Sequence, residues 1–185
     1  MDSDESFEFE RKFLVKDTGV VDCIPGDLLV QGYLLVADNY AVRVRLVVDP
    51  DSDVDRLLRE RDPRTCLLER SLRYSRAFFT VKSPPLNGVR YEAEMDVDVD
   101  VAVNICSRSV GCVIKTRYPV IHRDDLWVVD VFHGKNRPLM IAECERDQPV
   151  IKLDIPAFCG EEVTDRPEFT NEMLAIHPYS AWKNQ

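Results

Sequence analysis

The stretch FEFERKFL, residues 7–14, alternates charged and apolar side chains along most of its length. Successive side chains of a strand point to opposite faces, so a strand here places Glu8, Glu10 and Lys12 on one face. The other face is apolar except for Arg11. Taken alone, the pattern is typical of a surface strand with a solvated charged face. Two carboxylates two residues apart also repel each other unless a cation lies between them, so the recurrence of the pattern decides its meaning.

The chain has 185 residues, of which 45% are hydrophobic and 31% are charged. This composition is typical of a folded protein, and the length predicts a single domain over residues 1–185. The net charge of −9 argues against a general nucleic-acid-binding protein, because such proteins usually present a basic surface. No apolar run approaches the ~18 residues of a membrane span, and the cysteines form no C-x-x-C motif. We therefore expect a cytoplasmic protein with reduced thiols, and the sequence leaves open whether it is a monomer or a homodimer.

Seven further stretches have the alternation or the β-prone apolar composition of strands. They are residues 29–36, 40–48, 77–82, 89–95, 113–121, 126–132 and 139–145. Residues 96–109 predict extended structure and then a helix, and the tail after residue 155 is loop-like with a short helix after residue 171. Residues 49–76 form an inserted excursion, partly helical or mobile, that is first acidic and then rich in arginine. We interpret these arginines mainly as solvated charges, with contact to a substrate as the less favoured alternative.

Several of these strands carry charges at i and i+2 opposite an apolar face, or end in one inward charge. A closed antiparallel barrel explains the recurrence, because its charged faces converge inside while helices cover its apolar faces from outside. The converging carboxylates are those of Glu8, Glu10, Glu92, Glu94, Asp130, Glu143 and Glu145. The converging basic residues are Lys12, Arg43, Arg45, Lys82, Arg90, Lys115 and Arg117.

Such an interior costs too much desolvation to be present for stability alone, so it predicts a binding site for a highly charged ligand. Carboxylate oxygens are hard ligands that suit Mg²⁺ or Mn²⁺. Arginine and lysine suit the oxygens of phosphate groups. The two sets together therefore predict a site where a phosphate compound is held with a divalent cation.

The order of the motifs resembles that of the CYTH superfamily, the triphosphate tunnel metalloenzymes. The first half of the resemblance is carried by E-x-E-x-K at residues 8–12, QGYL from Gln31, VRVR at residues 42–45, TVK ending at Lys82 and RYEAE from Arg90. The second half is carried by KTRY from Lys115, VDVF around Asp130, AECE ending at Glu145, EVT and HPYSAW. The resemblance covers nearly the whole chain, and motifs in this number and order are far more specific than E-x-E-x-K alone.

The resemblance implies an α+β fold built on a closed eight-stranded antiparallel β-barrel, a tunnel, with helices packed outside. It implies a metal-dependent triphosphatase of the bacterial type, which would hydrolyse inorganic tripolyphosphate to pyrophosphate and phosphate with Mg²⁺ or Mn²⁺. In that reaction the catalytic residues would be Glu8, Glu10 and Lys12. The metal ligands would be Glu8, Glu10, Glu143 and Glu145, with Glu92, Glu94 and Asp130 as further ligands or their supports. The phosphates would be clamped by Lys12, Arg43, Arg45, Lys82, Arg90, Lys115 and Arg117.

The chain departs from the family pattern in two places. The excursion at residues 49–76 is longer than the usual connection, and Glu168 precedes Phe169 where bacterial relatives often carry a basic residue. Three alternatives stay open: a class IV adenylyl cyclase, a thiamine or nucleoside triphosphatase, and a non-catalytic binder of polyphosphate or nucleotide. A cyclase needs a pocket for a base, and no sequence feature establishes one.

Overall fold

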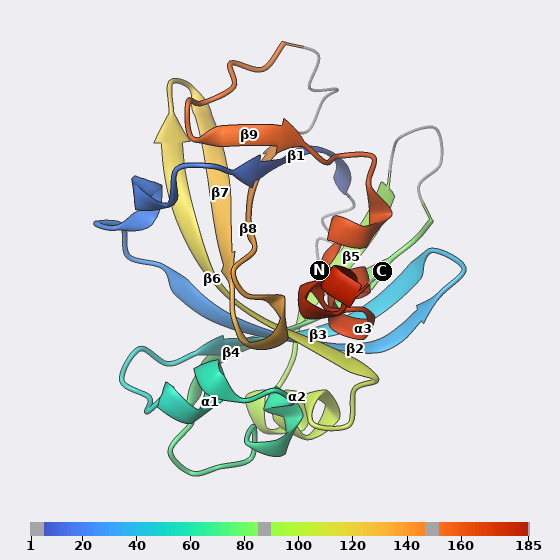
Figure 1. The fold of residues 1–185 in the computed structure, drawn as a ribbon. Helices are drawn as coiled ribbons and strands as arrows, with labels where there is room; N and C mark the ends of the chain where they lie inside the picture. Colours follow the sequence, from blue (N-terminus) through green and yellow to red (C-terminus); the bar gives the residue numbers. More distant parts are fainter. Residues whose placement is uncertain (1–5, 85–89, 147–151, 185) are drawn as a thin grey trace.

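The computed structural model describes residues 6–84, 90–146 and 152–184 and has the expected α+β class (Figure 1). Its strands form one antiparallel sheet in the order β5-β4-β3-β2-β6-β7-β8-β1-β9. The strands are β1 (Ser6–Val15), β2 (Asp27–Ala37), β3 (Tyr40–Val48), β4 (Tyr74–Lys82), β5 (Arg90–Asp96), β6 (Gly111–His122), β7 (Asp125–Phe132), β8 (Met140–Arg146) and β9 (Cys159–Glu162). The helices are α1 (Asp55–Arg59), α2 (Val99–Cys106) and α3 (Asn171–Ile176), with 3-10 turns η1 (Thr18–Val21), η2 (Pro63–Thr65), η3 (Gly134–Asn136), η4 (Pro167–Phe169) and η5 (Tyr179–Asn184). Within the described ranges, no helix combines the length and the hydropathy that a membrane crossing requires.

β1 has three neighbours in the sheet. It pairs with β8 from Phe9 to Leu14, and its first residues pair with β5, where Ser6 lies opposite Glu92. The sheet curls strongly enough to bring these two distant members of the strand order together (Figure 1). The third neighbour is β9, which pairs with the second half of β1.

The tail contains the predicted short helix, α3, but β9 corrects the prediction that the rest of the tail is loop-like. Its four residues, Cys159–Glu162, are too few and too polar to produce a recognisable strand pattern, and their pairing with β1 makes them a strand. The same strand explains Arg11, the one charge on the apolar face of β1. Arg11 donates hydrogen bonds of 2.8 and 2.6 Å to the two carboxylate oxygens of Glu162. All eight strands that the sequence predicts are present.

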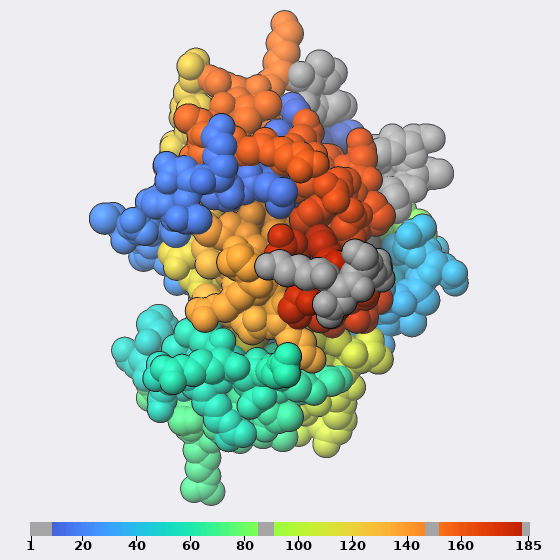
Figure 2. Space-filling view, viewed as in Figure 1, coloured from blue at the N-terminus to red at the C-terminus, as the bar shows by residue number. Residues whose placement is uncertain are grey.

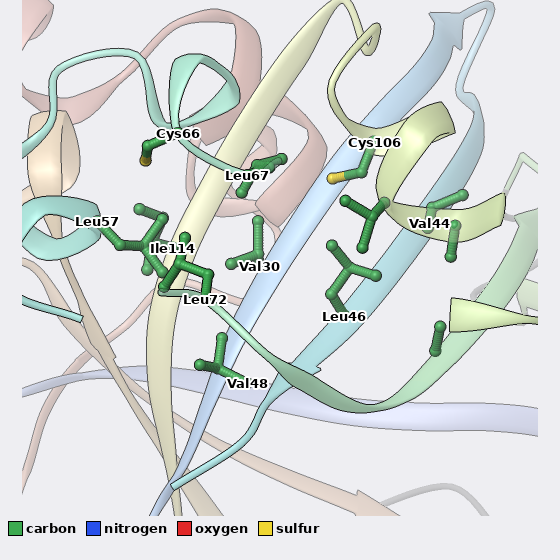
Figure 3. Close-up of a cluster of buried hydrophobic side chains, with 13 residues drawn as sticks. Val30, Val44, Leu46, Val48, Leu57, Cys66, Leu67, Leu72, Cys106 and Ile114 are labelled. Carbon is green, nitrogen blue, oxygen red and sulfur yellow. The ribbon is translucent and has the colours of Figure 1, made fainter. Parts of the chain in front are cut away.

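α2 and the excursion cover the outer face of β2, β3 and β4 (Figures 1 and 3). Val30, Val44 and Leu46 of the sheet are fully buried there, together with Leu57 of α1. The close approach explains the glycine of QGYL, since a Cβ on Gly32 would lie only 2.6 Å from Cys106 Sγ. The excursion is therefore a packed element.

The arginines of the excursion form local ion pairs. The pairs are Arg56–Glu69, Arg59–Asp55, Arg64–Asp62 and Arg73–Asp49. The partners in these four pairs all belong to the excursion, and Arg76 lies 4.0 Å from Asp27 of β2, which agrees with the interpretation of these arginines mainly as solvated charges.

α3 and the tail cover one end of the opposite face of the sheet. Val113 and Phe132 are buried there against Phe169 and Leu174. Thr170 caps α3, because its hydroxyl accepts a hydrogen bond from the backbone N–H of Met173. This end of the face is apolar, and the charged residues lie on the rest of it.

Candidate active site on the inner face of the sheet

The strand register places the predicted charged residues on one face of the sheet, which we call the inner face. Residues directly opposite each other in an antiparallel pair point to the same side. Glu10 lies opposite Glu145, and Lys12 lies opposite Glu143. The same relation continues across the sheet through Arg43–Thr80, Thr80–Glu94, Lys82–Glu92 and Arg117–Asp130. The inner face therefore collects side chains from every strand of the predicted barrel.

Lys12 is the centre of a first group, on β1 and β8. Its Nζ lies 3.0 Å from a carboxylate oxygen of Glu10 and 3.3 Å from one of Glu143. Burial by itself would lower the pKa of Lys12, but Glu10 and Glu143 hold it above its ordinary value, so Lys12 stays protonated. Burial likewise opposes ionisation of Glu10, and Lys12 outweighs it, so the pKa of Glu10 is lowered. Glu10 is half-buried and Glu145 is exposed, so this group is open to solvent on one side.

Arg43 is the centre of a second group, on β3, β4 and β5. One terminal nitrogen of its guanidinium donates to Glu92 and to Glu94, at 3.2 Å in each case, and the guanidinium also donates to Thr80 Oγ1. Arg45 makes a longer ion pair with Glu94, 3.5 Å, and its Nε has no hydrogen-bond partner among the described residues. Burial and the neighbouring Arg43 lower the pKa of Arg45 to about 10, so it remains charged at neutral pH. The positive charge of Arg45 is thus offset by neighbouring carboxylates less than that of Arg43.

Asp130 is the centre of a third group, on β6 and β7. It is fully buried, and its carboxylate accepts hydrogen bonds from Lys115 Nζ at 2.5 Å and from Arg117 at 2.8 Å. Burial alone would raise the pKa of Asp130, but Arg117 and Lys115 hold it well below its ordinary value. Burial, reinforced by Arg117, lowers the pKa of Lys115 to about 7. Arg117 also lies 3.2 Å from Glu143, which links this group to Lys12.

Three further residues of the predicted site are Lys82, Glu8 and Arg90. Lys82 forms an ion pair with Glu92 and so joins the Arg43 group. Glu8 lies opposite Arg90 in the pairing of β1 with β5. The side chains of Glu8 and Arg90 lie outside the described part of the structure, so their predicted roles stay predictions.

Three polar residues to which the sequence assigned no role also belong to the inner face. Thr80 Oγ1 donates to Glu94 at 2.7 Å, and Asn171 of α3 accepts a hydrogen bond of 2.9 Å from Lys115. Gln31 of β2 is fully buried. Gln31 and Thr80 are polar residues at inner positions of largely apolar strands, which is a signal that the sequence contains. Asn171 comes from the tail, and only the fold brings it to Lys115.

The carboxylates of the first group have the chemistry of a divalent-cation site. Glu10, Glu143 and Glu145 neighbour one another in the register of β1 and β8, and their hard oxygens are the ligands that Mg²⁺ and Mn²⁺ prefer. Over residues 6–84, 90–146 and 152–184, no three His, Cys, Asp or Glu side chains are arranged closely enough to hold an ion as they stand. The carboxylate oxygens are suitable ligands for such a cation. To bind it, Glu10 and Glu143 would have to give up their ion pairs with Lys12.

A cavity of about 230 Å³ lies elsewhere, between η2, the start of β6, η3 and α3. The residues found to line it include no predicted site residue, and its Arg64 is paired with Asp62. In the space-filling view, side chains of β8 and the C-terminal segment fill the space inside the curve of the ribbon (Figure 2). We therefore locate the candidate site by its converging charges.

The chain is similar to known proteins that act on a phosphate compound. No protein-family model matches the chain. An inorganic triphosphatase of Nitrosomonas europaea is 30% identical over 176 residues, which are 91% of this chain and 97% of that protein. The chain belongs to the CYTH superfamily.

Two further similarities support membership in the CYTH superfamily. An inorganic triphosphatase of Acetivibrio thermocellus is 28% identical over 180 residues, which are 95% of this chain and 97% of that protein. A crystal structure of an inorganic triphosphatase covers 91% of this chain and 94% of its own, with a TM-score of 0.57 and 28% identity. Each of the three similarities covers at least 91% of this chain.

Proposed function

We propose that this CYTH protein is a metal-dependent triphosphatase that hydrolyses inorganic tripolyphosphate to pyrophosphate and phosphate on the inner face. The observation that carries the proposal is the convergence of basic side chains from β1, β3, β4 and β6 on one face. Among the described side chains, the cations on that face are Lys12, Arg43, Arg45, Lys82, Lys115 and Arg117. The relatives named inorganic triphosphatase favour tripolyphosphate over a nucleotide or thiamine compound as the substrate.

We further propose that the sheet closes into a tunnel around this site. The pairing of Ser6, Phe7 and Glu8 with β5 supports closure, because β5 and β1 lie far apart in the strand order. Closure would make the inner face an interior with restricted access to water, and charged groups interact more strongly in such surroundings. β9 would then lie outside the ring of β1 to β8.

The charge balance argues for a divalent cation as cofactor, Mg²⁺ or Mn²⁺. Among the described side chains, the carboxylates that face these cations include Glu10, Glu92, Glu94, Asp130, Glu143 and Glu145, and Glu172 of α3 also interacts with Glu10 and Lys12. A triphosphate added to this set of charges brings a large negative excess, which a divalent cation offsets. We assign the cation to Glu10, Glu143 and Glu145, with Glu8 as the further ligand that the E-x-E motif predicts. When bound, the cation supplies Lewis-acid neutralisation of charge on phosphate oxygens.

The chain's own residues would bind and orient the triphosphate. Arg45, whose Nε is unpartnered among the described residues, is the cation most ready to donate a hydrogen bond to a phosphate oxygen. Arg43, in contrast, is held in place by Glu92 and Glu94, which fixes the geometry of the guanidinium before substrate arrives. Cations fixed in this way stabilise the charge that develops on the departing pyrophosphate.

We place the reacting phosphate group beside Lys12 and Glu10. Lys12 stays protonated at neutral pH, so it offers a permanent positive charge close to the carboxylates. Glu10 is ionised and half-exposed, so it can accept a hydrogen bond from an incoming water molecule and orient it. We therefore place the attacking water on the solvent-exposed side of this group.

The proposal is tested by phosphate release from tripolyphosphate, ATP and thiamine triphosphate, each with Mg²⁺, Mn²⁺ or EDTA. We expect release that depends on the metal and is fastest with tripolyphosphate. Formation of cyclic AMP from ATP would instead assign a cyclase. Tight binding of tripolyphosphate without release of phosphate would assign a binding protein.

A further inference from the structure

Gln31 is a buried polar residue of the inner face to which the proposed function gives no role. It lies in the middle of β2, opposite Arg45 on one side and Val113 on the other. Its side chain is fully buried, yet neither its amide nitrogen nor its amide oxygen has a hydrogen-bond partner among the described residues. Such a group costs folding free energy and therefore calls for an explanation in a native structure.

Packing does not explain an amide at this position. Val113, directly opposite, is fully buried and apolar, and Leu29 precedes Gln31 on the same face of β2. A methionine of similar length and volume would fill the same space without an unsatisfied polar group. The amide is thus retained at a cost in stability, which is typical of a functional residue.

The surroundings indicate which partner the amide lacks. Arg45, its neighbour across the strand pair, also has an unpartnered donor in its Nε. The amide nitrogen of Gln31 and the Nε of Arg45 are both N–H donors, so an oxygen-rich anion satisfies these two groups together, while the amide oxygen of Gln31 is an acceptor that such an anion does not satisfy. Neither group is reached by bulk water, so the acceptor has to enter the inner face with a ligand.

β2 itself is held on both of its faces. On the outer face, α2 approaches so closely that Gly32 has no room for a Cβ beside Cys106. On the inner face, α3 contacts both β2 and β6. The backbone of Gln31 is therefore fixed, and an amide on a fixed strand is a preorganised donor.

We propose that Gln31 is a substrate-binding residue, whose amide N–H donates, next to Arg45, to an oxygen of the triphosphate. This inference rests on the proposed function, because it needs an anionic ligand on the inner face. A neutral donor adds a directed hydrogen bond to the triphosphate without changing the charge balance of the site.

The experiment compares wild type with Q31M for kcat, KM with tripolyphosphate, and Tm. We expect Q31M to raise KM about tenfold, which corresponds to about 1.4 kcal/mol of lost binding, and to have a Tm equal to or higher than that of wild type. Q31E should raise KM further, because it places a carboxylate beside the phosphates. V30A is the matched control on the outer face of the same strand, and it should lower Tm without changing KM.

An unchanged KM in Q31M overturns the inference, whether its Tm rises or falls. A lower Tm together with an unchanged KM would show that the amide has a structural partner. If Q31M does not fold, Q31N, which retracts the amide by one methylene, gives the same comparison. An inactive wild-type protein defeats the proposed function and this inference together, whereas an active wild type with an unaffected Q31M defeats only the role of Gln31.

Discussion

The inner and outer faces of the same sheet are held together by different forces. On the outer face, Val44 and Leu46 pack with α2 and the excursion through apolar contacts (Figure 3). On the inner face, Arg43 and Lys115 are equally buried, but each is held by carboxylates. Apolar burial stabilises a fold, whereas the gain from a buried ion pair is largely offset by its desolvation. The comparison indicates that the outer face provides stability, and it supports the proposal that the inner face carries the activity.

Replacing Asp130, a residue of the inner face, should have the largest effect on the free energy of unfolding. Replacing Asp130 by Asn should lower the free energy of unfolding by about 3–5 kcal/mol, because Lys115 and Arg117 lose their shared carboxylate inside the protein. Urea unfolding measures this loss. The matched control is Glu145→Gln, an exposed carboxylate of the same face, which should leave stability nearly unchanged. A free energy of unfolding equal to that of wild type for Asp130→Asn would contradict the ion-pair account.

Replacing Glu10 should lower activity and leave stability nearly unchanged. Glu10→Gln should lower kcat at least 100-fold with tripolyphosphate, a loss of about 2.7 kcal/mol, because it removes a metal ligand and a carboxylate that orients water. Its Tm should stay close to that of wild type, since the side chain is half-exposed. Glu161→Gln, on the exposed part of β9, is the control and should have normal kcat and Tm. Wild-type turnover in Glu10→Gln would remove Glu10 from the site.

Replacing Leu57 of α1 tests whether the excursion contributes to stability and not to activity. Leu57→Ala should lower the free energy of unfolding by about 2–3 kcal/mol, because it leaves a cavity in the outer core. Its kcat/KM should remain that of wild type when folded protein is compared. Leu68→Ala, in the same segment but 59% exposed, should change neither quantity. A loss of activity in Leu57→Ala without a loss of stability would mean that the excursion contributes to the site.

The ion pair between Arg11 and Glu162 should have the smallest effect. The hydrogen bonds from Arg11 lower the pKa of Glu162, so the pair stabilises the folded state above the ordinary carboxylate pKa. That contribution is lost as the pH falls through the lowered pKa of the folded state. Both side chains are partly exposed, so Glu162→Gln should cost less than about 1 kcal/mol at pH 7, and the difference from wild type should shrink toward pH 3. A difference that grows on acidification would contradict the assigned direction of the pKa shift.

The strands of the sheet could be predicted because their side chains alternate with period two. The alternation also assigned Lys12, Arg43 and Asp130 to one face, and the structure places them there. β9 escaped prediction because its pairing with β1 depends on a partner far along the chain.

The partners of the inner charges could not be predicted from the sequence. Alternation fixes the face on which a side chain lies, but the register between strands decides which carboxylate meets which cation. Arg117 reaches Asp130 on one neighbouring strand and Glu143 on another, and neither distance follows from the spacing of residues along the chain. Asn171 reaches Lys115 only because α3 packs over the end of the sheet.

The central claim is that the inner face binds a triphosphate. Calorimetric titration of tripolyphosphate into Glu10→Gln with Mg²⁺ tests it directly, because slow turnover in this variant leaves the ligand intact during the measurement. We expect one binding site per chain. Adding Arg45→Gln should weaken binding at least tenfold, because Arg45 makes only a longer ion pair with Glu94 and its Nε has no hydrogen-bond partner among the described residues. Equal affinity with and without Arg45, in two proteins that are equally folded, would contradict the account.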